Sequence, residues 1–87
     1  MNYTTDTLTR DSIGNFVLEI LVSMGVEANN ITDESNLEDL GLDSLDVVDL
    51  IRAVRKQLMI QIAAADFEKV ETIKQAVTVI ADKAGIQ

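Results

Sequence analysis

Apolar residues recur at spacings of three and four in three stretches of the chain, and this spacing predicts three amphipathic helices. We expect the first helix over about residues 7–24, the second over about 44–58 and the last over about 72–84. The apolar stripes consist of Ile13, Phe16, Val17, Ile20, Leu21 and Met24; of Val47, Leu50, Ile51, Val54 and Leu58; and of Ile73, Ala76, Val77, Ile80 and Ala84. No stretch alternates apolar and polar residues for long enough to predict a sheet.

Polar residues and glycines at the ends of these stretches fit helix caps. One of the polar residues at 5–7 is expected to cap the first helix, and Gly25 suits its end. Thr72 and Gln75 have the spacing of a capping box at the start of the last helix, and Gly85 suits its end.

A long connection, about residues 25–43, separates the first two helices, and a loop of this length in a small domain usually has a function. Ile31, Leu37 and Leu40 are expected to pin this loop to the core. A short helix is expected over about 64–69, with Phe67 pointing inward. The sequence therefore predicts an all-α fold: one domain over residues 1–87, built as a small bundle of three longer helices and one short helix.

Composition narrows the chemistry. The chain of 87 residues has no Cys, His or Pro, so it holds no disulfide, no thiol nucleophile and no histidine base. Because 47% of the residues are hydrophobic and only 3% aromatic, aliphatic side chains must fill the core. The formal net charge of -8 argues against nucleic acid as a partner. No apolar run approaches a membrane span, and the first residues lack the features of a signal peptide, so we expect a cytoplasmic monomer.

The charge is distributed unevenly. Residues 1–49 contain 11 acidic residues and one basic residue, whereas residues 50–87 contain four acidic and six basic ones. This asymmetry indicates that one region presents a negative face to a basic partner. The acidic loop does not have the ligand spacing of a calcium-binding loop, so no metal site is predicted.

The candidate functional residues lie where the long loop meets the second helix. Ser44 places a hydroxyl at a helix start, where backbone N–H groups and the helix dipole favour an attached phosphodiester. The alternative is that Asp43 or Ser44 only caps the helix. Leu45 and Val48 fall outside the apolar stripe and lie beside acidic residues at 46 and 49, an arrangement typical of a docking patch.

The run Leu40-Gly41-Leu42-Asp43-Ser44-Leu45 resembles the phosphopantetheine attachment motif of acyl carrier proteins, and the likeness extends from about residue 7 to residue 84. The resemblance implies a four-helix bundle that is not an enzyme. It also implies that a phosphopantetheinyl transferase attaches 4'-phosphopantetheine from coenzyme A to Ser44, and that the arm carries acyl groups as thioesters. Asp43, preceding the serine, is more typical of acyl carriers than of peptidyl carriers.

The resemblance also implies partners and a docking surface. The second helix is the recognition helix of the family, read by basic patches on partner enzymes. The matching positions here are Leu45, Asp46, Val48 and Asp49, together with Arg52. The expected partners are the transferase, an acyl-loading ligase or acyltransferase, and condensing or other acyl-processing enzymes.

The sequence departs from the pattern of housekeeping fatty-acid carriers after Asp49, where Arg52, Arg55 and Lys56 make the helix basic. The segment at 60–62 also lacks the Pro that is common in the family. These differences favour a dedicated carrier of a specialised lipid, polyketide or lipopeptide pathway. Two alternatives remain open: an aminoacyl or peptidyl carrier of a non-ribosomal system, and a helical interaction module without the arm.

Overall fold

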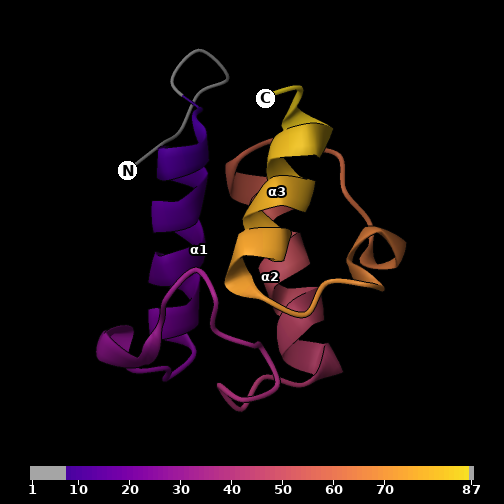
Figure 1. The fold of residues 1–87 in the computed structure, drawn as a ribbon. Coiled ribbons are helices and arrows are strands. Elements are labelled where there is room, and N and C mark those ends of the chain that lie inside the picture. The colour runs from indigo at the N-terminus through magenta and orange to yellow at the C-terminus, as the bar shows by residue number, and fades with distance from the viewer. Residues whose placement is uncertain (1–7, 87) are drawn as a thin grey trace.

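The computed structural model describes residues 8–86, which form three α-helices and two short 3-10 helices (Figure 1). The elements are, in chain order, α1 (Arg10–Ser23), η2 (Ala28–Asn30), α2 (Ser44–Gln57), η3 (Ala64–Phe67) and α3 (Ile73–Ala84). The described residues contain no strand, only an isolated antiparallel bridge between Asn36 and Thr72. The all-α prediction and the three longer helices are confirmed.

The short helix expected over about 64–69 is confirmed only in part. Within that range, the structure has the four-residue 3-10 helix η3. The Asp66 carboxylate accepts a hydrogen bond from the backbone N–H of Ala63 at 2.9 Å, and this closes the turn locally. Phe67 is buried as expected. One tight turn is therefore enough to deliver Phe67 to the core.

The start of α1 also differs from the prediction. The N-cap is Thr9, whose hydroxyl accepts a hydrogen bond from the N–H of Ser12 at 3.1 Å, while the Ser12 hydroxyl accepts one from the N–H of Thr9 at 2.8 Å. This reciprocal box starts the helix at Arg10 rather than near residue 7. The polar residues at 5–7, which were the predicted caps, lie outside the described residues.

The helices pack around one aliphatic core. α1 packs against both α3 and α2, and η3 packs against α2 and α3. In Figure 1, α1 runs from top to bottom, whereas α2 and α3 run from bottom to top. The largest fully buried side chains are Phe16, Ile13, Leu21, Leu50, Ile80, Val17 and Val54. All seven belong to the predicted stripes, so the core is the one that periodicity predicts.

The segment after α2 alternates between exposed and buried side chains. Ile60 and Ile62 are buried, while Met59 is 80% exposed and has a positive φ of 59°. The buried side chains of Ile60 and Ile62 therefore anchor the segment between α2 and η3 to the core, without pairing to a strand. In the part of the chain that the structure describes, no helix is long and apolar enough to cross a membrane.

Candidate functional site

The long loop is held against the start of α3, and this fixes where α2 begins. The backbone N–H of Leu37 donates to the carbonyl of Glu71 at 2.8 Å, and the N–H of Ile73 donates to the carbonyl of Ser35 at 3.0 Å. Leu37 is buried, whereas Ile31 and Leu40 pack against the core while partly exposed. These contacts confirm that the loop is pinned to the core.

A compact turn follows this anchor. The N–H of Gly41 donates to the carbonyl of Glu38 at 3.0 Å, and the N–H of Leu42 returns to the carbonyl of Leu37 at 3.1 Å. Gly41 has a φ of +84°, a backbone conformation that L side chains adopt only at a cost. The turn leaves Asp43 in an extended conformation directly before the helix.

The cap of α2 is Asp43 and not Ser44. One carboxylate oxygen of Asp43 accepts hydrogen bonds from the N–H groups of Leu45 and Asp46, both at 3.0 Å. The Asp46 carboxylate in turn accepts a hydrogen bond from the N–H of Asp43 at 3.1 Å, which completes a capping box. Ser44 therefore does not cap α2.

Ser44 is the first residue of the helix, and it is exposed. Among residues 8–86, neither its hydroxyl nor its backbone N–H has a hydrogen-bond partner. The capping box satisfies the donors on either side and leaves these two groups facing solvent. A phosphodiester on the hydroxyl would therefore displace no contact, and it would lie beside one free donor at the positive end of the helix.

A shallow cleft of about 420 Å³ opens beside Ser44. Its apolar lining comes from Leu37, Leu42, Val47 and Val70, and its polar lining from Asn36, Glu38, Asp43, Ser44 and Glu71. Val70 and Glu71 were not predicted to belong to the site, because only the hydrogen bond between Leu37 and Glu71 brings the residues before α3 next to α2. The cleft therefore offers apolar side chains together with carboxylates and an amide next to the Ser44 hydroxyl.

The predicted docking residues follow α2 away from Ser44. Leu45 is 72% exposed, and Asp49 and Arg52 are also exposed. Asp46 and Val48 are half buried. Asp46 holds the capping box, so its carboxylate has a structural partner in addition to any docking role.

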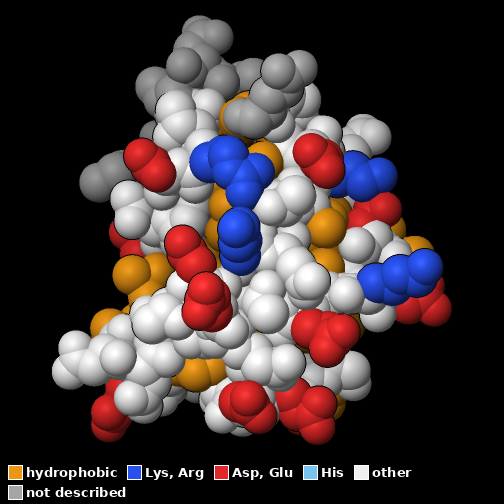
Figure 2. All heavy atoms as spheres, viewed as in Figure 1, with side chains coloured by type: hydrophobic (Ala, Val, Ile, Leu, Met, Phe, Trp, Pro, Cys, Tyr) orange, Lys and Arg blue, Asp and Glu red, His pale blue; other side chains and the backbone are white. Residues whose placement is uncertain are grey.

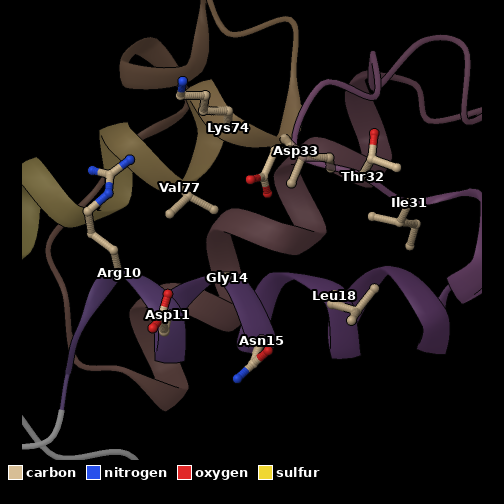
Figure 3. A pocket seen from close by; sticks show the side chains of 11 residues that line it. Arg10, Asp11, Gly14, Asn15, Leu18, Ile31, Thr32, Asp33, Lys74 and Val77 are labelled. Atoms are coloured by element: carbon tan, nitrogen blue, oxygen red, sulfur yellow. The ribbon is translucent and has the colours of Figure 1, made fainter.

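A separate cleft of about 410 Å³ lies between α1, α3 and residues 31–33 (Figure 3). Arg10 and Lys74 line it together with Asp11 and Asp33, so its charged side chains balance. The Arg10 guanidinium donates a hydrogen bond to the Thr78 hydroxyl at 2.8 Å. No residue of α2 lines this cleft, and it has no part in the Ser44 site.

Acidic side chains dominate the region of the loop. On the face shown in Figure 2, the lower edge carries acidic side chains and no Lys or Arg, and residues 25–43 run there in Figure 1. Within residues 8–86, no group of three or more acidic residues is placed to hold a metal ion. The acidic side chains of the loop therefore form an exposed negative surface and not a metal site.

Comparisons with known proteins agree with this geometry. The family model described as the phosphopantetheine attachment site matches residues 15–80. Proteins named acyl carrier protein from Chlorobium phaeobacteroides, Chlorobium phaeovibrioides and Chlorobium luteolum are each 41% identical over 78 residues. Each alignment covers 87% of this chain and the full length of the relative. The chain belongs to the acyl carrier protein family, whose members are carriers with a covalent 4'-phosphopantetheine and not enzymes.

Proposed function

We propose that Ser44 bears the 4'-phosphopantetheine, and that the protein presents thioester-linked acyl groups to the enzymes of a specialised lipid, polyketide or lipopeptide pathway. The observation that carries this proposal is the free hydroxyl of Ser44. Asp43 and Asp46 cap the helix without it, and Ser44 is exposed and lines a cleft that is partly apolar.

The attachment step is a displacement at phosphorus. The Ser44 oxygen forms a bond to the phosphorus that bears the pantetheine of coenzyme A, the bond to the second phosphate breaks, and adenosine 3',5'-bisphosphate leaves. The hydroxyl proton is taken by a base of the transferase as the new bond forms. The thiol of the arm supplies the acyl-bearing group that the chain itself lacks.

The cleft beside Ser44 supports binding of part of the attached acyl chain. Leu37, Leu42, Val47 and Val70 provide an apolar lining next to the attachment point. An aliphatic acyl chain lying there would remove apolar surface from water, at roughly 25 cal/mol per Å². Glu38 and Glu71 at the rim would keep the mouth of the cleft solvated.

The test is intact mass spectrometry before and after incubation with coenzyme A and a broad-specificity phosphopantetheinyl transferase. We expect a gain of one phosphopantetheine in the wild type and none in Ser44→Ala. Circular dichroism of Ser44→Ala serves as the control for folding of this variant. An unchanged mass in folded wild type, with an active transferase, would instead support the interaction module without the arm.

A further inference from the structure

The outer face of α2 carries a line of four exposed residues that the capping and the core do not explain. Leu45, Asp49, Arg52 and Lys56 follow one another at spacings of four, three and four, which places them on one stripe of the helix. All four side chains are exposed. From the Ser44 end, the stripe is apolar, then negative, then positive over its last two members.

The two cations of the stripe are free to meet a partner. Asp49 and Arg52 are three residues apart and on the same face, yet within residues 8–86 the one ion pair joins Lys83 to Asp66. Lys56 lies in the last turn, where the helix dipole favours a cation. Arg52 lies before the last turn, so the dipole does not account for it.

The spacing defines what a partner must offer. At 1.5 Å of rise per residue, Asp49 lies about 6 Å along the helix axis from Leu45, and Lys56 lies roughly 10 Å beyond Asp49. A uniformly basic surface that contacts Asp49 would bring its distal part against Arg52 and Lys56. Such like-charge contacts discriminate against a wrong partner.

We propose that the acyl-processing enzyme served by this carrier docks on the stripe with a two-sign surface: a basic group opposite Asp49 and an acidic group, about 5–10 Å farther from the active-site entrance, opposite Arg52 and Lys56. This rests on the proposed function, because Ser44 at one end of α2 sets the direction of approach. Under this proposal, the positive charges of Arg52 and Lys56 select among partner enzymes.

A second copy of the chain is the competing occupant. Two α2 helices packed antiparallel would bring Asp49 of each copy near Arg52 of the other. However, each copy has a formal net charge of -8, and the exposed apolar contact on the stripe is limited to Leu45. Long-range repulsion with little apolar area to bury favours a different protein as the partner.

The experiment compares two double variants that change the net charge equally. In Arg52→Gln/Lys56→Gln the stripe loses its cations, whereas Lys69→Gln/Lys74→Gln removes two exposed cations outside α2. Holo-protein is first confirmed by intact mass, so that a failure of attachment is detected separately. The kcat/KM of acyl transfer is then measured at low and high salt with purified acyl-loading, condensing and acyltransfer enzymes encoded by the same genome.

We expect at least one enzyme to lose about three- to tenfold in kcat/KM at low salt with Arg52→Gln/Lys56→Gln, and to lose much less with the control pair. The same enzyme should lose rate with Asp49→Asn, and high salt should reduce both losses. The proposal is overturned if no enzyme loses rate with the stripe variant. It is also overturned if sedimentation shows a wild-type dimer that Arg52→Gln/Lys56→Gln dissociates.

Discussion

Replacing Asp43 by Ala tests the division of labour at the start of α2. The change removes the acceptor of two backbone hydrogen bonds, from the N–H groups of Leu45 and Asp46. Loss of an N-cap of this kind costs about 1 kcal/mol, within a range of roughly 0.5–2 kcal/mol. In a domain of this size, 1 kcal/mol lowers the Tm by about 4–8 °C. Ser44→Ala removes no hydrogen bond among the described residues, so its effect should stay within about 0.5 kcal/mol.

Thermal and urea unfolding, followed by circular dichroism at the helix band, measure both effects. Asp43→Asn should lie close to wild type, because Asn caps helices about as well as Asp. Asp39→Ala removes an equally exposed negative charge nearby without touching the cap, and it controls for the general repulsion of an acidic chain. If Ser44→Ala destabilises the protein as much as Asp43→Ala does, the serine is the cap and the reasoning is refuted.

Three further outcomes follow from local backbone and charge. Met59→Gly should raise the free energy of unfolding by roughly 0.5–1 kcal/mol and Met59→Val should lower it, because the φ of 59° strains any side chain and a β-branched one most; equal effects in urea unfolding would contradict this. Gly41→Ala should lower the free energy of unfolding by about 1–2 kcal/mol. The cause would be the φ of +84° alone, since an added Cβ would meet no atom within 4 Å. An unchanged free energy of unfolding would contradict this explanation. The hydrogen bond from the N–H of Ala63, and then Lys83, lower the pKa of Asp66 below its ordinary 3.8. The ionised Asp66 carboxylate therefore stabilises the fold fully above pH 3.8, and this stabilisation is lost as the pH falls through the lowered pKa. Asp66→Asn should therefore be less stable than wild type near neutral pH, and this difference in the free energy of unfolding should become smaller below about pH 4. A difference that does not change with pH would contradict the assignment.

The parts of the fold that depend on periodicity were predictable from the sequence. The stripes of α1, α2 and α3 supply the buried core, and the Thr72 and Gln75 capping box begins α3 where it was predicted. The start of α1 was wrong because several Thr and Asp residues precede the stripe, and only the reciprocal bonds of Thr9 and Ser12 select one of them. The short helix is confirmed only in part, as the 3-10 helix η3 over Ala64–Phe67, because composition alone does not fix the type or the length of a single helical turn.

The candidate site was predictable as a motif but not as a surface. Asp43 and Ser44 are adjacent in the sequence, so their junction with α2 needed only the motif. Val70 and Glu71 reach the same cleft through the hydrogen bond from Leu37 to Glu71, which joins segments more than 30 residues apart. Pairing over such a distance leaves no periodic signal, and the choice between Asp43 and Ser44 as the cap also required the observed hydrogen bonds.

The position of Ser44 separates the stability of the domain from the modification proposed at this residue. The residues that hold the start of α2 are its neighbours, Asp43 and Asp46, whereas the hydroxyl and the backbone N–H of Ser44 make no hydrogen bond among residues 8–86. A bulky phosphodiester at this residue therefore adds to the surface without displacing a packed or bonded group. The loop anchor at Leu37 supports the same arrangement from below, because it fixes both the turn before Asp43 and the wall of the cleft. An exposed serine beside a hydrogen-bonded cap and an anchored loop is thus suited to the proposed attachment, which would leave the helical core unchanged.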